Sequence, residues 1–173
     1  MGRSPELSYD IYIAATSQAV WRGLVDGEMT SKYVYGTRLE SSLKAGARFA
    51  YVGDGAFEPV SGEVIAAEPE RRLVLRWQAR WDEKVAKDRP SRVTYEIDPA
   101  GPEMTRLRLR HDDFEQETAT YLGSADAWPW MMSSLKSLLE TGRPFRPPRP
   151  PERGSGGRIP SSRSWDDNPT TGP

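Results

Sequence analysis

Apolar and polar residues alternate through residues 72–81, 92–97 and 106–111, with arginine as the recurring polar residue. A period of two predicts β-strands that each have one buried and one exposed face. The predicted buried face is rich in leucine and aromatic residues, namely Leu73, Leu75, Trp77, Trp81, Val93, Tyr95, Ile97, Leu107 and Leu109. A sheet face of this kind must be covered by another apolar surface.

A long amphipathic helix near the C-terminal end of the sequence can supply that cover. Its apolar positions recur at helical spacing at Trp128, Met131, Met132, Leu135, Leu138 and Leu139. Ser124 or Asp126 is the candidate N-cap, which places Pro129 in the first turn, where proline is tolerated. Gly142 is the candidate C-terminal stop. We therefore expect this helix to lie across the apolar face of the sheet.

The first part of the chain supplies the remaining elements. Alternation over residues 9–13 predicts a strand, and helical spacing from Thr16 or Ser17 to Gly27 predicts a helix, followed by a short helical segment over residues 29–33. Further strands are predicted at residues 37–41, 47–52 and 60–68, separated by glycine-containing turns. The order is strand, helix, six strands and a long helix, which is an α+β arrangement with an antiparallel sheet.

The composition changes sharply after the predicted long helix. Eight of the 15 prolines lie beyond Arg143, together with runs of glycine, serine and arginine. A segment with so few apolar residues cannot bury enough surface to offset its ordering entropy. We expect one folded domain at residues 1–143 and a disordered Pro/Arg/Gly-rich tail at residues 144–173.

Composition also excludes several classes of function. The chain has 24 Lys and Arg against 25 Asp and Glu, a net charge of −1, which argues against a nucleic-acid-binding protein. It has no cysteine and one histidine, which leaves no thiolate nucleophile and none of the usual zinc-ligand sets, so that only an oxygen-ligated metal remains possible. We expect neither a metal nor an organic cofactor. No apolar stretch reaches the roughly 18 residues of a membrane span, and no apolar run follows the N-terminal charge. A cytoplasmic protein without membrane contact is expected.

Several motifs together carry a resemblance to a known family. They lie at residues 19–21, 62–64, 68–73, 91–97, 105–109 and 111–114, and at residues 135–142 in the long helix. In this order they resemble the SRPBCC (START-like, helix-grip) superfamily, in the branch named for the activator of heat-shock protein 90 ATPase, over about residues 9–144. The resemblance implies a curved antiparallel sheet of about seven strands around a long C-terminal helix. It also implies an apolar cavity between them, which in many relatives holds a hydrophobic small molecule.

The bulky residues of the sheet and helix are the candidate ligand-binding set. We expect the cavity wall to consist of Trp77, Trp81, Tyr95, His111, Trp128, Met131 and Met132, because ligand pockets are mostly apolar with a few placed polar groups. The alternative is that these side chains fill the core and leave no cavity.

Three residues are weak candidates for catalysis. His111, the only histidine, shares the inner-face parity of Leu107 and Leu109 and could act as an acid or base. Asp113 has the same parity and would orient His111 if the strand continues that far. Glu63 follows Gly62, where glycine in a strand often marks a bulge that re-aims a side chain. The alternatives are a structural, hydrogen-bonded histidine and a glutamate exposed on the outer face.

Three functions remain open at this stage. The first is a module that binds a hydrophobic or aromatic small molecule, the second a cyclase or hydrolase that uses His111, and the third a protein-interaction module that acts on a chaperone. For the third, the arginines of the outer face could dock an acidic partner. Pairing of these arginines across the strands with Glu96 and Asp98 is the simpler interpretation.

Removal of the tail tests the predicted domain boundary. A chain that ends at Arg146 should have nearly the melting temperature of the full chain, because the tail has little apolar surface to bury. Thermal unfolding followed by circular dichroism measures this, and a decrease of more than a few degrees would mean that the tail contributes to the folded domain.

Overall fold

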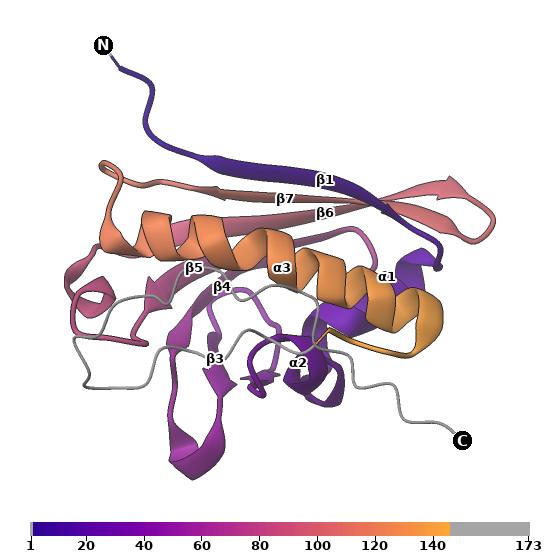
Figure 1. Ribbon diagram of the computed structural model, residues 1–173, viewed down its shortest axis with the longest axis horizontal. Coiled ribbons are helices and arrows are strands. Elements are labelled where there is room, and N and C mark those ends of the chain that lie inside the picture. The colour runs from indigo at the N-terminus through magenta and orange to yellow at the C-terminus, as the bar shows by residue number, and fades with distance from the viewer. Residues whose placement is uncertain (1, 146–173) are drawn as a thin grey trace, which may run out of the picture.

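Seven strands form one antiparallel sheet in the computed structural model, which describes residues 2–145 (Figure 1). The strands are β1 (Leu7–Ile13), β2 (Arg38–Ser41), β3 (Arg48–Val52), β4 (Val60–Glu68), β5 (Arg72–Ala79), β6 (Ser91–Gly101) and β7 (Met104–Asp112). Their order in the sheet is β1-β7-β6-β5-β4-β3-β2. Strands β2 to β7 pair in chain order, and β1 pairs with β7. The first and the last strand of the described residues therefore lie side by side at one edge of the sheet.

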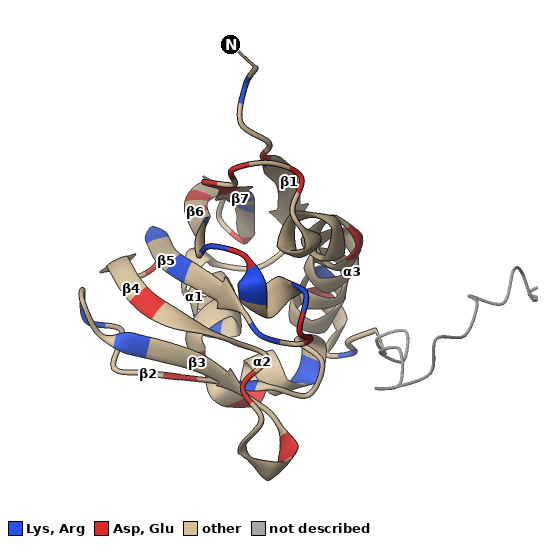
Figure 2. Cartoon of the chain, turned by 90° about the vertical axis from the view of Figure 1, so that its left-hand side faces the viewer, with Lys and Arg blue, Asp and Glu red and all other residues tan. Residues whose placement is uncertain are grey.

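Three α-helices accompany the sheet within residues 2–145. They are α1 (Ser17–Val25), α2 (Gly27–Tyr33) and the long α3 (Ala119–Thr141), and two short 3₁₀ helices lie at η1 (Asp54–Ala56) and η2 (Val85–Lys87). The sheet curves from β2 to β1, and α3 lies on its inner side (Figure 2). This is the predicted α+β helix-grip architecture, and the expected order of elements is confirmed. The predicted tail lies, from residue 146 onward, outside the described residues.

The long helix begins earlier than predicted. Its N-cap is Thr118, whose side chain accepts a hydrogen bond from the backbone N–H of Tyr121 at 3.2 Å, so the prediction of Ser124 or Asp126 was wrong. Asp88 also accepts hydrogen bonds from the backbone and the hydroxyl of Thr120, each at 2.7 Å. An acceptor from a loop distant in the sequence therefore stabilises the first turn of α3, and the local sequence contains no signal that predicts this contact.

The earlier start places Pro129 inside α3 and not in its first turn. Proline has no N–H, so the carbonyl of Ala125 lacks its helical donor. The hydroxyl of Tyr9 on β1 lies 3.5 Å from this carbonyl and is placed to donate to it. A strand residue therefore compensates for the backbone bond that the proline removes.

The predicted inner face of the sheet is the core of the protein. Its residues on β5, β6 and β7 are all buried: Leu73, Leu75, Trp77, Val93, Tyr95, Ile97, Leu107 and Leu109. Trp81 is the exception, because β5 ends at Ala79 and Trp81 is only partly buried. An ideal Cβ at Gly123 would lie 3.0 Å from the Trp81 ring, so Trp81 packs closely against the start of α3.

Three arginines of the outer face are paired with acidic neighbours. Arg92 binds Asp112 through two hydrogen bonds of 2.8 and 2.9 Å, and Arg106 pairs with Asp10. Arg108 lies 2.7 Å from Asp98 and 3.6 Å from Glu96. Basic and acidic positions are interspersed over the strands in Figure 2. Exposed pairs of this kind contribute little to stability, about 0–1 kcal/mol each, but they neutralise much of the face.

Gly62 occupies the point of closest approach between β4 and β5. A Cβ at this position would lie 1.8 Å from the backbone oxygen of Arg76 and 3.1 Å from the ring of Phe49. The predicted bulge at this glycine is not observed, since the register of β4 shifts between Val64 and Ala66. Gly62 is required because only a residue without a side chain allows the two backbones to approach this closely.

Substitution of this glycine should disrupt the sheet. We expect Gly62→Ala to lower the free energy of unfolding by about 3 kcal/mol or more, because the methyl group overlaps backbone that cannot move independently. Gly101→Ala is the matched control, since its Cβ would lie 3.6 Å from the nearest atom, in ordinary contact. Urea unfolding of both variants measures the difference, and equal stabilities would contradict the close approach.

Candidate functional site

Seven rings from the sheet, from α3 and from the segment that follows β7 form a continuous inner aromatic cluster. Its members are Phe49, Tyr51, Trp77, Tyr95, His111, Phe114 and Trp128. Trp77 lies at the centre, with ring centroids 5.4 Å from Trp128, 5.6 Å from Tyr51 and 5.9 Å from His111. None of the seven residues exposes more than 5% of its surface. Tilted and edge-on aromatic packing at these distances stabilises the interior.

His111 is held by hydrogen bonds from both sides. The indole N–H of Trp128 on α3 donates to its Nδ1 at 3.0 Å, and its Nε2 lies 2.7 Å from the hydroxyl of Ser91 on β6. The same hydroxyl lies 3.4 Å from the backbone oxygen of Trp77. Side chains from α3, β7 and β6 are therefore joined by one buried chain of hydrogen bonds.

The direction of this chain fixes the tautomer of His111. An indole nitrogen can only donate, so Nδ1 must be the acceptor and Nε2 of the neutral ring carries the proton. His111 then donates to Ser91, whose hydroxyl donates onward to the carbonyl of Trp77. A histidine that activates a serine must instead accept the serine proton. The arrangement has the opposite polarity to a catalytic serine–histidine pair.

The surroundings also keep His111 uncharged. Burial lowers the pKa of His111 to about 3. Asp112, next to it in the chain, favours the charged form, but this carboxylate faces the outer side and pairs with Arg92. Protonation would also place an N–H at Nδ1, directly opposite the N–H of Trp128. The ring is therefore neutral across the physiological pH range.

Three tyrosine hydroxyls lie inside the same region. Burial raises the pKa of Tyr33 and of Tyr95 well above the usual value, and it raises the pKa of Tyr51 as well. Tyr51 and Tyr95 are hydrogen-bonded to each other, and Tyr33 donates to the carbonyl of Gly23 at 2.8 Å. These hydroxyls stay protonated and place polar groups in an otherwise apolar space.

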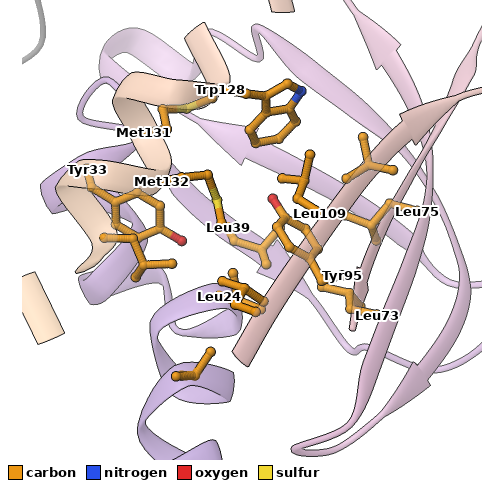
Figure 3. Packing of buried hydrophobic residues seen from close by; sticks show 14 of the residues in the cluster. Leu24, Tyr33, Leu39, Leu73, Leu75, Tyr95, Leu109, Trp128, Met131 and Met132 are labelled. Carbon is orange, nitrogen blue, oxygen red and sulfur yellow. The ribbon is translucent and has the colours of Figure 1, made fainter. Parts of the chain in front are cut away.

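Two adjacent methionines of α3 lie beside Tyr33, Tyr95 and Trp128. In Figure 3 Met132 lies between Tyr33 and Tyr95, and Met131 lies beside Trp128. Met131 and Met132 are 6% and 3% exposed. Methionine is unbranched and flexible, so it adapts to changes in the shape of its surroundings.

The structure brings most of the predicted ligand-binding residues together. Trp77, Tyr95, His111, Trp128, Met131 and Met132 all belong to the buried core between the sheet and α3. Trp81 lies apart from them, beyond the end of β5 and against α3 at Gly123.

The two carboxylates that sequence reasoning proposed beside His111 do not reach it. Strand β7 ends at Asp112, and Asp113 has a left-handed backbone with φ of 65° and is exposed, so the strand parity does not extend to it. Glu63 is exposed on the outer face of β4. Neither residue can orient the histidine or face the inner aromatic cluster from this position.

Several residues of the site were not predicted. Tyr51 shares the parity of Phe49 on β3, and Ser91 shares that of Val93 and Tyr95 on β6, so strand parity could have identified them. Tyr33 was outside any recognised pattern, because α2 is too short to show a periodic face. The partner of His111 was thus detectable, but its role depends on the tertiary contact with Trp128.

One polar group of the inner aromatic cluster has no partner. The indole Nε1 of Trp77 is buried and makes no hydrogen bond within the described part of the chain. Buried N–H groups are almost always paired, because leaving one without an acceptor is unfavourable. This donor is therefore the chemically unsatisfied feature of the site.

The described pockets lie elsewhere on the surface. One of about 310 Å³ lies along α3 at residues such as Ser133, Lys136 and Phe145, and one of about 140 Å³ lies on the outer face near Arg72 and Arg108. Neither is lined by the inner aromatic cluster. Among residues 2–145 no group of three His, Cys, Asp or Glu side chains is placed to bind a metal ion. None of the helices in this range has the length and apolarity needed to cross a bilayer.

Comparison with known families supports the resemblance noted in the sequence. The family model "Activator of Hsp90 ATPase homolog 1-like protein" matches residues 14–140, which is most of the chain. The chain belongs to this family. The match includes α1, α2 and the strands β2 to β7, and it extends through α3 to residue 140. No curated protein sequence matches the chain.

Solved structures share the fold of this family member. Protein MLL2253 from Mesorhizobium loti is 25% identical, with 78% of this chain and 96% of that chain covered and a TM-score of 0.65. The Aha1 dimer from Colwellia psychrerythraea is 15% identical (80% and 98% covered, TM-score 0.64). PFC0360w, an HSP90 activator from Plasmodium falciparum, is 18% identical (78% and 95% covered, TM-score 0.63). At such identities the last two show a common fold.

The buried histidine predicts a specific dependence of stability on pH. The unfolded chain protonates His111 near pH 6.5, whereas the folded protein with its pKa of about 3 does not. Stability from this group is therefore complete above pH 6.5 and is lost as the pH falls towards 3. Between pH 7 and pH 5 the free energy of unfolding should decrease by about 2 kcal/mol.

Urea unfolding at pH 7, 6 and 5 measures this decrease. Because the chain has one histidine, His111→Gln removes the only side chain with an ordinary pKa in this range. The variant should be less stable at pH 7 and nearly independent of pH between 7 and 5. A wild-type protein whose stability does not change over this range would contradict a neutral buried histidine.

Proposed function

We propose that this protein binds a small hydrophobic or aromatic molecule between the inner face of the sheet and α3. The observation that carries the proposal is the composition of this space. Met131 and Met132 from α3 lie beside Tyr33, Tyr95 and Trp128, in a buried core that also contains Tyr51. Pockets for small molecules combine these features, a mostly apolar aromatic wall and a few fixed polar groups.

The interior contains more tyrosine hydroxyls than a core that only has to be filled would need. Tyr33, Tyr51 and Tyr95 could each be replaced by phenylalanine in an interior that only needs to be filled, since a buried hydroxyl must find a partner. Tyr51 and Tyr95 satisfy each other. A ligand in this space would therefore meet fixed polar groups beside its apolar wall.

Entry of a ligand requires movement of side chains, because the inner aromatic cluster is closely packed. Met131 and Met132 are the residues suited to move, since a methionine has three rotatable bonds and loses little packing energy on changing rotamer. Both are on α3, so the ligand would lie between the helix and the rings of Trp77, Tyr95 and Trp128. The binding site therefore opens by induced fit and not as a preformed cavity.

The alternatives have less support. A hydrolase or cyclase that uses His111 as a base is disfavoured by the polarity of its hydrogen bonds, since Nε2 holds the proton that a base would have to accept. Docking of an acidic partner on the outer face is disfavoured because Arg92, Arg106 and Arg108 already have acidic neighbours. The interior, by contrast, holds a buried donor without a partner among the described residues, the indole N–H of Trp77.

Truncation of one methionine should improve binding. We expect Met132→Ala to bind the neutral dye Nile red about tenfold more tightly than the wild type, because the dye no longer has to displace the side chain; tenfold corresponds to 1.4 kcal/mol. Met104→Ala is the control, because Met104 is 43% exposed on β7 and away from α3. It should bind like the wild type.

Native mass spectrometry of the purified wild type provides an independent measurement. A ligand retained from the cell would add a defined mass to the protein, and denaturation would release it. Binding of no dye by either the wild type or Met132→Ala, together with a native mass equal to that of the polypeptide, would refute the proposed function.

A further inference from the structure

Trp77 offers the one donor that the inner aromatic cluster leaves unused among the described residues. Its side chain is 4% exposed, and its Nε1 has no hydrogen-bond partner. It lies between Tyr51, His111 and Trp128, with all three ring centroids within 6 Å. An acceptor that reached this nitrogen would satisfy it without breaking an existing bond.

The other polar groups of the region are already committed. Nδ1 of His111 accepts from Trp128, and Nε2 is bonded to Ser91. Tyr51 and Tyr95 are bonded to each other. Since an indole nitrogen can only donate, a ligand must supply an acceptor, and a ligand whose polar groups are all donors leaves Trp77 unsatisfied.

Among residues 2–145 no Asp, Glu, Lys or Arg side chain is buried in this region. Arg76 and Arg92 are on the same strands as rings of the inner aromatic cluster, but they belong to the opposite, outer face of the sheet. Asp112, the nearest carboxylate in the chain to His111, is paired with Arg92 there. A buried ionic ligand would have no counter-ion, and an unpaired buried charge is strongly unfavourable.

We propose that the ligand is an uncharged aromatic compound with an acceptor oxygen, of the ketone, ester or quinone class, and that Trp77 Nε1 donates to this oxygen. This inference rests on the proposed function, because it assigns the polar contact of the same site. The aromatic part of the ligand packs on the rings of Trp128 and Tyr95, and the oxygen points to β5. Carboxylates and amines are excluded by the absence of a counter-ion.

Three naphthalene probes of nearly equal size separate these requirements. 2-Acetonaphthone has an acceptor and no charge, 2-ethylnaphthalene has neither, and 2-naphthoate is an anion at pH 7. We expect the affinity to decrease in the order acetonaphthone, ethylnaphthalene, naphthoate. Binding is measured from the quenching of tryptophan fluorescence.

The substitution Trp77→Phe removes the donor and keeps an aromatic ring. It should weaken binding of 2-acetonaphthone by about two- to tenfold, the effect of one neutral hydrogen bond, and leave binding of 2-ethylnaphthalene nearly unchanged. Trp21→Phe is the matched control, because Trp21 is on α1 and outside the inner aromatic cluster. It should affect neither probe.

The indole protons provide a direct readout of the contact. The chain has six tryptophans, and the ¹H–¹⁵N signal that Trp77→Phe removes identifies Trp77. This signal should move downfield on addition of 2-acetonaphthone, as expected for a new hydrogen bond, and much less on addition of 2-ethylnaphthalene.

The outcomes distinguish the two proposals. If no naphthalene probe binds, this inference fails; the proposed function fails with it only if Nile red also does not bind and the native mass equals that of the polypeptide. If 2-ethylnaphthalene binds as well as 2-acetonaphthone, and Trp77→Phe weakens both equally, the site binds apolar molecules but Trp77 is not its donor. Tighter binding of 2-naphthoate than of the neutral probes would likewise overturn the inference and leave the proposed function intact.

Discussion

The hydrogen bond from Trp128 to His111 is the contact on which the interior depends. Both groups are buried, and the bond joins α3 to the inner face of the sheet at 3.0 Å. The apolar stripe of α3 sets which face of the helix meets the sheet, and a buried donor must in addition meet its acceptor. The bond therefore adds a directional contact to the apolar packing, in a helix face that also carries the buried Met131 and Met132.

The same bond decides the chemistry of the site. Because Trp128 can only donate, it sets the tautomer of His111, and through it the direction of the bond to Ser91. Together with burial it keeps the ring uncharged. A residue that sequence alone presents as a candidate base is thus a structural link between helix and sheet. Its position in the core, not its residue type, determines this role.

The fold could be predicted from the sequence to a large extent because it depends on local periodicity. Alternation located the strands, and strand parity placed His111 on the inner face. The incorrect predictions concern the ends of elements, whose positions do not follow from local periodicity. The start of α3 is stabilised by Asp88, and its first turns hold too many small residues to show an apolar stripe. Asp113 lies past a strand end, where a left-handed residue breaks the parity.

The site could be predicted only in its composition, because its function depends on which polar atoms find partners. The sequence identifies Trp77 and Trp128 as equivalent inner-face tryptophans, yet one indole N–H is bonded and the other is not. Members of one fold family can share a sheet, a helix and their apolar contacts while differing in such single atoms. The unbonded indole N–H of Trp77 adds nothing to the stability of the fold, so we attribute its role to the binding of a ligand. In this protein the distinction between core and binding site is therefore made by hydrogen bonding and not by hydrophobicity.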